Sequence, residues 1–294
     1  MLKKYTKQIL SFFFITLSIG FSMAFDGTGT INSGGITRSY TYHYPGSNLN
    51  PNLPLMIVYH GDGGTGSSIQ ATTGFNAIAD ANNFFVVYPD AIGTYWNTYV
   101  DNSPGSPDDV NAPDDVLFTS DLIDELCFSY YINRDKVYAT GHSAGGFMCY
   151  NLSIQLNDQI AAIAPASANI YGDQNFLDTY YLTAPVLVPI YHIHGDADID
   201  ATGVQYMDVD DVANGDEYPV SYLGSINCGN DIYSETTIVA GVYKKSYCNA
   251  PVEVCLIQVA GLGHAWPNTS GYNTAQSIWD FARRLRYLVC RRSL

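Results

Sequence analysis

The chain has 294 residues, of which 28 are Asp or Glu and 13 are Lys or Arg, giving a formal net charge of −15. Nucleic acids and anionic membrane surfaces are bound by clustered Lys and Arg, so this balance argues against both as partners. The length fits one large α/β domain, because single hydrophobic cores stop growing near about 250 to 300 residues.

The first 24 residues have the pattern of a secretory signal peptide. Three lysines precede an apolar run over residues 9–21, and residues 22–24 supply the small side chains that a signal peptidase reads. A membrane anchor is the alternative, but the run is shorter than the ~20 residues that span a bilayer. We expect a mature chain that begins near Phe25, is secreted to the extracellular space or the periplasm, and has no stable membrane association.

Two kinds of segment alternate along the rest of the chain. Continuous apolar runs typical of buried parallel strands occur at 54–60, 84–88, 136–140, 160–164, 186–194 and 252–259. Helix-like segments occur at 68–82, 115–130, 144–155 and 274–289. The alternation predicts βαβ crossovers, and therefore a mostly parallel, doubly wound sheet with helices on both faces. We expect residues 25–294 to form this single α/β domain.

A G-x-S-x-G motif spans residues 141–145, directly after the apolar run at 136–140 and before an apolar helix. In this strand–turn–helix context the motif places a serine on a sharp, strained turn, and the strain exposes its hydroxyl above the edge of the sheet. Small residues must stand two positions away on either side. We predict that Ser143 is a catalytic nucleophile.

A serine hydroxyl needs a histidine to take its proton, and in this kind of fold the acid and the histidine follow the serine along the chain. Among six histidines, only His264 lies in a Gly-rich loop after the last predicted strand, so we predict it as the general base. The strongest rival, His194, ends a strand, where a packed and hydrogen-bonded role is expected. The acid should follow it, where Asp196, Asp198 and Asp200 compete. The pattern alone does not rank them.

The oxyanion that forms during acyl transfer requires two backbone N–H donors. Ala144, directly after the nucleophile, is expected to supply one. The second is expected from residues 60–64, His-Gly-Asp-Gly-Gly, which are similar to the HGGG-type loop of esterases. We predict the N–H of Asp62 first and that of Gly63 second. The Asp62 carboxylate should turn away, because it would repel the oxyanion.

Six cysteines in an exported chain favour disulfides, but six allow 15 pairings and the sequence does not choose among them.

The acidic stretch at 196–217 lacks the spacing of an EF-hand loop, and we predict no metal site there. The proposed acyl transfer to water needs no metal or organic cofactor. The oligomeric state is left open.

Several motifs together carry a family resemblance. They are His60-Gly61 with Gly63-Gly64, Tyr88-Pro89-Asp90 followed by Trp96, Asp114-Asp115-Val116, residues 134–146, His194-Gly195-x-x-Asp198, Asn227-Cys228, Tyr247-Cys248 and Gly263-His264-x-Trp266-Pro267. On these residues most of the mature chain resembles the extracellular polyhydroxybutyrate depolymerase and feruloyl esterase family of α/β-hydrolases. The G-H-x-W-P ending is far more specific than the G-x-S-x-G motif.

The resemblance implies an α/β-hydrolase fold and a serine esterase. It selects Asp198, three residues after the glycine of the H-G pair, and it supports a disulfide between Cys228 and Cys248. Trp96 and Trp266 match positions beside the catalytic centre, where they would flank an acyl group, although both are alternatively core residues. The family usually continues after the acid with a Val-Pro-Tyr run that residues 199–206 lack.

The substrate implied first is a small or polymeric ester of short hydroxyalkanoates, and the alternative is a feruloyl or acetyl ester of plant polysaccharide. A hydrolase-fold binding protein without activity and a peptidase are the rival functions. The first usually lacks one triad member, whereas this sequence has a candidate for each. A fluorophosphonate would label only an activated serine, and turnover of casein would reveal a peptidase.

Overall fold

The computed structural model describes residues 23–46, 52–98, 112–169, 187–198, 219–229, 232–248, 252–269 and 271–287. The expected signal peptide lies outside these ranges except for its last two residues. Asp200, Cys290 and most of the acidic stretch at 196–217 also lie outside them. Within the described part, no helix is long and apolar enough to cross a bilayer.

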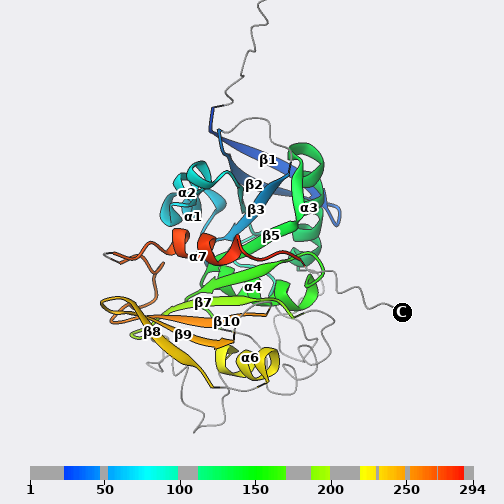
Figure 1. The fold of residues 1–294 in the computed structure, drawn as a ribbon. Coiled ribbons are helices and arrows are strands. Elements are labelled where there is room, and N and C mark those ends of the chain that lie inside the picture. Colours follow the sequence, from blue (N-terminus) through cyan, green and yellow to red (C-terminus); the bar gives the residue numbers. More distant parts are fainter. Residues whose placement is uncertain are drawn as a thin grey trace, which may run out of the picture.

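A single ten-stranded sheet runs through the described residues, with the order β1-β2-β4-β3-β5-β6-β7-β10-β9-β8 (Figure 1). The six inner strands, from β4 to β10 in this order, pair in parallel, whereas two strands at each end pair antiparallel. The strands are β1 (Phe25–Ser33), β2 (Ile36–Tyr44), β3 (Leu53–Tyr59), β4 (Phe85–Pro89), β5 (Ile132–His142), β6 (Ala162–Ala166), β7 (Ile190–Gly195), β8 (Ser234–Val239), β9 (Val242–Cys248) and β10 (Val254–Val259). The mostly parallel sheet expected from the sequence is confirmed.

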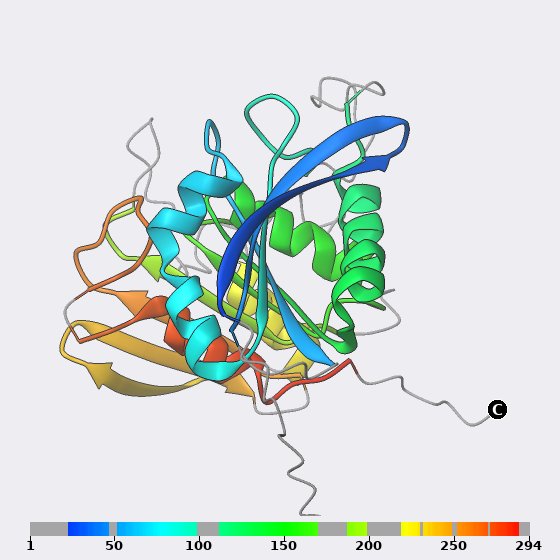
Figure 2. The same ribbon diagram turned by 90° about the horizontal axis from the view of Figure 1, so that it is seen from above.

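Helices cover both faces of the sheet (Figure 2). They are α1 (Gly66–Thr73), α2 (Phe75–Asn82), α3 (Asp115–Tyr130), α4 (Ala144–Gln155), α6 (Pro219–Cys228) and α7 (Thr274–Ala282). Alternate residues of β3 point to opposite faces. Leu55 and Ile57 join the core beneath α3 and α4, and Met56 and Val58 join the core beneath α1, α2 and α7. Both faces of the central strands are therefore buried, which explains their continuous apolar sequences.

Four strands at the two ends of the sheet, β1, β2, β8 and β9, are absent from the sequence prediction. Their residues are too polar to form an apolar run, because one or both faces of these strands remain accessible to solvent. In β1, a Cβ on Gly27 or Gly29 would lie 2.4 or 2.3 Å from the ring of Tyr42 or Tyr40 on β2. These glycines allow the tyrosine rings to lie across the strand.

Three helices differ from the sequence prediction. The segment at 68–82 is divided into α1 and α2 at Gly74, whose φ of 74° ends the first helix in the left-handed region. Helix α7 ends at Ala282, before the predicted end at 289, and α6 was not predicted at all.

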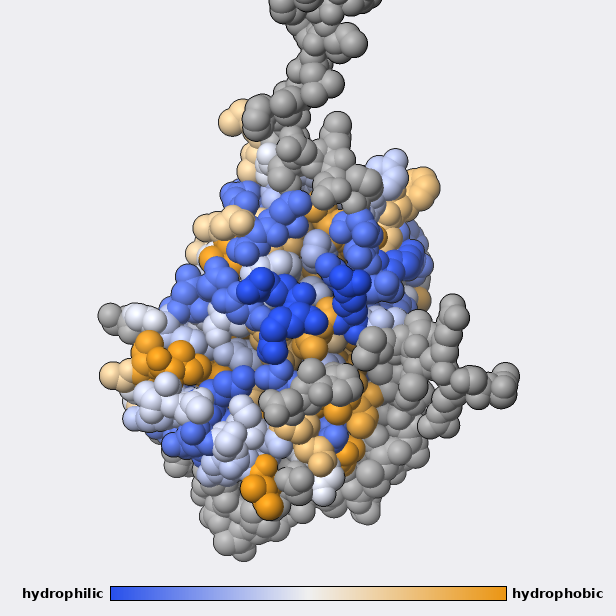
Figure 3. Space-filling view, in the orientation of Figure 1, coloured by the Kyte–Doolittle hydropathy of each residue, from blue (hydrophilic) through white to orange (hydrophobic). Residues whose placement is uncertain are grey.

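Over α7, the surface is mainly hydrophilic, and hydrophobic residues occupy smaller separate areas of the same face (Figure 3).

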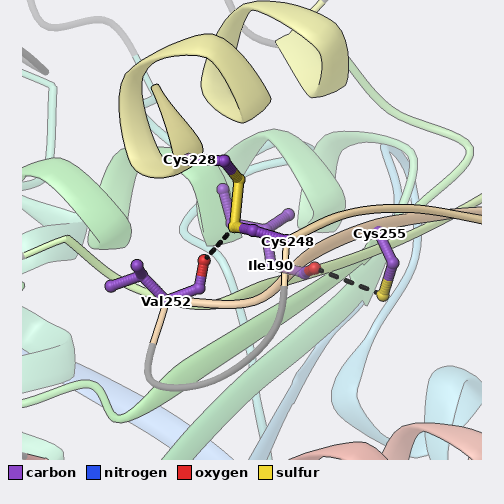
Figure 4. Close-up of a disulfide and its surroundings, with 5 residues drawn as sticks. All are labelled: Ile190, Cys228, Cys248, Val252 and Cys255. Atoms are coloured by element: carbon purple, nitrogen blue, oxygen red, sulfur yellow. Dashed lines mark hydrogen bonds between the residues drawn. A yellow bond between two sulfur atoms is a disulfide. The ribbon is translucent and has the colours of Figure 1, made fainter. Parts of the chain in front are cut away.

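The expected disulfide between Cys228 and Cys248 is present and joins the end of α6 to the end of β9 (Figure 4). Cys127, Cys149 and Cys255 carry free thiols. Cys149 and Cys255 are fully buried, and burial raises the pKa of both thiols. Cys149 is thus an inert core residue despite its position six residues after Ser143.

Candidate active site

Ser143 lies in the sharp turn between β5 and α4, with φ 54° and ψ −121°. This left-handed φ is strained for a residue with a side chain. A Cβ on Gly141 would lie 2.5 Å from the carbonyl oxygen of Gly145, and one on Gly145 would lie 2.3 Å from that of Tyr59. The turn therefore admits only glycine at these two positions. It is held by a hydrogen bond of 3.0 Å from Ser143 N–H to the carbonyl oxygen of Ala166.

The structure brings Ser143, His264 and Asp198 together at the carboxyl ends of β5, β10 and β7. Nε2 of His264 lies 2.9 Å from Oγ of Ser143. Its Nδ1 lies 3.1 and 3.0 Å from the two carboxylate oxygens of Asp198. The neutral ring can thus donate from Nδ1 to the carboxylate and accept the serine proton at Nε2. Loops at the carboxyl edge of a parallel sheet are the usual place for such a site.

The two described carboxylates after β7 have different partners. Asp196 accepts hydrogen bonds from Gly261 N–H at 2.6 Å and from Nε2 of Gln258 at 3.3 Å, so it holds the loop that follows β10. Asp198 is fully buried and contacts His264 instead. Burial acts to raise the pKa of Asp198, but hydrogen bonds from His194 and His264 outweigh it, and the pKa is lowered.

His194 is not positioned to act as the base. It is buried, and both of its nitrogens have partners: Nε2 lies 2.9 Å from Oδ2 of Asp198, and Nδ1 lies 2.9 Å from Nε2 of His192. His192 in turn contacts the hydroxyl of Tyr150 at 2.6 Å. His192 and Tyr150 were not predicted as residues of the site. A His-x-His pair on a predicted strand could have indicated the contact between His192 and His194, because alternate residues of a strand share a face.

Two further histidines border the site. The ring of His142 lies 5.0 Å from that of His264, and burial, followed by the charge of His264, lowers the pKa of His142 to about 4. Burial also lowers the pKa of His60. Nε2 of His60 accepts the N–H of Ala91 at 3.1 Å, and its Nδ1 contacts the carbonyl oxygen of Gly61. His60 thereby ties the loop after β3 to the loop after β4.

The loop after β3 passes beside Ser143, because a Cβ on Gly61 would lie 3.3 Å from Cβ of Ser143. In this loop the N–H of Gly63 donates to the carbonyl oxygen of Thr94 at 2.7 Å, and that of Gly64 donates to Gly61 at 3.0 Å. The N–H of Gly63, which was the second candidate for the oxyanion hole, is therefore already hydrogen-bonded. The N–H of Asp62 is the remaining candidate in this loop. The side chain of Asp62 is exposed to solvent. Ala144 is the first residue of α4, where the helix leaves its N–H without an internal partner.

Trp96 and Trp266 are both buried. Trp96 donates from Nε1 to the carbonyl oxygen of His60 at 2.9 Å and packs edge-on against Tyr59, so it supports the loop that carries Asp62. Trp266 follows His264 by two residues along the chain, and its ring packs edge-on against that of Phe75. In this structure both tryptophans lie in core positions. Among the described residues, no group of three or more His, Cys, Asp or Glu is arranged to hold a metal ion.

Sequence comparison finds relatives that are named as esterases. The chain is 29% identical over 245 residues to a bifunctional acetylxylan esterase/xylanase of Neocallimastix patriciarum, covering 81% of this chain and 32% of that protein. It is 28% identical over 129 residues to poly(3-hydroxyalkanoate) depolymerase C of Paucimonas lemoignei, covering 44% and 31%. It is 31% identical over 121 residues to feruloyl esterase B of Piromyces equi, covering 40% and 21%. The chain thus spans at most about a third of the length of these three relatives. No family model matches the sequence.

Among solved structures, an acetyl xylan esterase from Aspergillus awamori superposes with a TM-score of 0.61 at 14% identity, covering 87% of this chain and 99% of that one. This similarity confirms the expected α/β-hydrolase fold. The resemblance drawn from the motifs is also confirmed, because the names of the matched relatives include a poly(3-hydroxyalkanoate) depolymerase and a feruloyl esterase.

Proposed function

We propose that this chain is a secreted serine esterase that hydrolyses carboxylic esters through Ser143, His264 and Asp198. The observation that carries the proposal is the continuous contact from Oγ of Ser143 through the His264 ring to the buried Asp198 carboxylate, with distances of 2.9 and 3.0 Å. The three residues occur in the chain order that this fold requires. The names of the relatives give independent support.

In the proposed mechanism, Oγ of Ser143 attacks the ester carbonyl while Nε2 of His264 accepts its proton. Asp198 stabilises the resulting imidazolium through Nδ1. The N–H groups of Ala144 and Asp62 donate to the oxyanion of the tetrahedral intermediate. His264 then protonates the leaving alkoxide, and a water molecule hydrolyses the acyl-enzyme by the same steps.

The first substrate class that we propose is short hydroxyalkanoate esters, and the second is acetyl or feruloyl esters of plant polysaccharide. The second has a specific observation in its favour, since the match to the acetylxylan esterase/xylanase covers 81% of this chain and that to the depolymerase covers 44%. Initial rates on hydroxybutyrate oligomers, acetylated xylan and methyl ferulate would rank these classes. A preference for either polysaccharide-type ester over the oligomers would reverse the order that we propose.

The test of the mechanism is Ser143→Ala, compared with Ser129→Ala on the exposed surface of α3. Ser143→Ala should abolish fluorophosphonate labelling and lower kcat on p-nitrophenyl acetate by roughly 10⁴-fold or more, because the triad acts as a unit. Ser129→Ala should change neither. Labelling of the Ser143→Ala protein at a different serine, with activity retained, would refute the assignment.

We also propose that residues 1–24 are removed on export and that residues 25–294 form one catalytic domain. The disulfide supports this location, because such bonds persist in oxidising compartments. The mass and N-terminal sequence of the protein recovered from the medium or periplasm test the proposal. A mature chain that retains its first 24 residues would refute it.

A further inference from the structure

We propose that Tyr150, His192 and His194 form a buried hydrogen-bond chain that positions the carboxylate of Asp198 toward His264. This proposal rests on the serine esterase mechanism proposed above. The three residues do not contact the reacting atoms. They act through Asp198 and are therefore positioning residues.

The chain runs without a break from α4 to the loop after β7. The hydroxyl of Tyr150 lies 2.6 Å from Nδ1 of His192, Nε2 of His192 lies 2.9 Å from Nδ1 of His194, and Nε2 of His194 lies 2.9 Å from Oδ2 of Asp198. The four residues are at most 2% exposed. The two imidazole rings are stacked, with centroids 5.2 Å apart. Such contacts are strong because bulk water does not compete for them.

The direction of every hydrogen bond follows from the charge of Asp198. An ionised carboxylate only accepts, so Nε2 of His194 carries the proton. Burial lowers the pKa of His194 and of His192, which keeps both rings neutral with one N–H each. Nδ1 of His194 must then accept from Nε2–H of His192, and Nδ1 of His192 must accept from the hydroxyl of Tyr150. All donors in the chain point toward Asp198.

This arrangement gives the Asp198 carboxylate two histidine donors: Nε2 of His194 contacts Oδ2, and Nδ1 of His264 contacts both oxygens. A buried carboxylate is costly unless its charge is compensated, so the second donor helps to keep Asp198 ionised. It also restrains the rotation of the carboxylate. Tyr150 lies on the helix that begins directly after Ser143, so the same helix orients the nucleophile and the far end of the chain.

Nitrogen-15 NMR of the mature protein labelled on histidine tests the direction of the protons. At pH 7 we expect His192 and His194 as neutral Nε2–H tautomers and His264 as the Nδ1–H tautomer, with signals assigned from single His→Gln variants. This readout does not depend on activity. A protonated imidazolium, or an Nδ1–H tautomer, at either His192 or His194 would refute the proposal.

Kinetics test the effect on catalysis. Tyr150→Phe removes only the terminal hydroxyl and should lower kcat by roughly 10-fold with little change in KM. Hydrogen-bond partners that orient metal ligands contribute about 10- to 100-fold, and we expect the lower end of this range for a residue that acts on Asp198 through two histidines. The matched control is Tyr138→Phe, which removes an equally buried hydroxyl that donates to the carbonyl oxygen of Leu285 at 2.8 Å. It should leave kcat unchanged. Equal kcat values for the two variants would overturn the proposal.

A second pair of variants separates hydrogen bonding from packing. His194→Gln retains an N–H donor near the position of Nε2, whereas His194→Leu retains volume without a donor. The Leu variant should lose about 10-fold more kcat than the Gln variant, and equal losses would contradict the proposal. If Ser143→Ala abolishes activity while these pairs behave alike, only the positioning role fails. If Ser143→Ala remains active, the esterase mechanism itself fails.

Discussion

Asp198→Asn is the variant that most directly tests how the site works. The substitution keeps the size of a buried side chain whose oxygens accept from two histidine N–H groups. Nδ1 of His264 lies 3.1 and 3.0 Å from the two carboxylate oxygens, so the NH₂ group of the amide comes within reach of this nitrogen in either orientation. If it faces His264, the ring has to present a lone pair at Nδ1 and carry its proton on Nε2. That tautomer cannot accept the proton of Ser143.

The expected loss follows from the geometry. The carboxylate lies 3.0 Å from Nδ1 of His264. Two unit charges at this distance attract by about 1.4 kcal/mol at the dielectric constant of water and by about 5.5 kcal/mol at an effective value near 20. The side chain of Asp198 is 1% exposed and that of His264 is 45% exposed, so the site lies between these limits. Since each 1.36 kcal/mol is tenfold in rate, kcat should fall by between about 10-fold and 10⁴-fold, and the wrong tautomer favours the upper end.

The assay is kcat on p-nitrophenyl acetate, with circular dichroism and thermal unfolding to verify the fold. Asp196→Asn is the matched control, because its amide oxygen can still accept the N–H of Gly261, and it should lose far less activity. A larger loss for Asp196→Asn than for Asp198→Asn would refute the reasoning.

Three further predictions concern stability. Reducing the Cys228–Cys248 bond, which closes a loop of 20 residues, should cost about 3 kcal/mol and lower the melting temperature by roughly 5 to 10 °C; an unchanged melting curve with verified free thiols would contradict this. Burial lowers the pKa of His142 in the folded protein to about 4. As the pH falls below about 6.5, this imidazole is therefore protonated in the unfolded chain before it is protonated in the folded protein. Stability should therefore decline by up to about 3 kcal/mol between pH 6.5 and 4, and urea unfolding should show a smaller decline for His142→Gln. Gly145→Ala should yield little folded protein by expression and circular dichroism, because the new Cβ would lie 2.3 Å from the carbonyl oxygen of Tyr59; a native-like melting temperature would argue against this steric account.

Local sequence was sufficient to predict the centre of the sheet and the turn that carries Ser143. Parallel strands covered on both faces require continuous apolar runs, and the turn at Ser143 requires glycine at positions where any Cβ would meet backbone. Both requirements can be recognised from a few consecutive residues. The end strands were missed because their partly exposed residues show no such pattern. In β1 the glycines make room for tyrosine rings on β2, a relation between two strands that neither strand reveals alone.

The different contacts of Asp196 and Asp198 illustrate what only the tertiary structure determines. Asp196 and Asp198 are two residues apart and chemically identical, and local sequence did not separate them; the family resemblance favoured Asp198. In the fold, the loop after β7 is bonded to the loop after β10, with Asp196 N–H donating to Val259 at 3.1 Å and Ala197 N–H donating to Leu262 at 3.0 Å. This pairing turns the Asp196 carboxylate toward Gly261 and leaves Asp198 to face His264. Contacts between residues more than 60 positions apart distinguish the two carboxylates, and such contacts exist only once the sheet has formed.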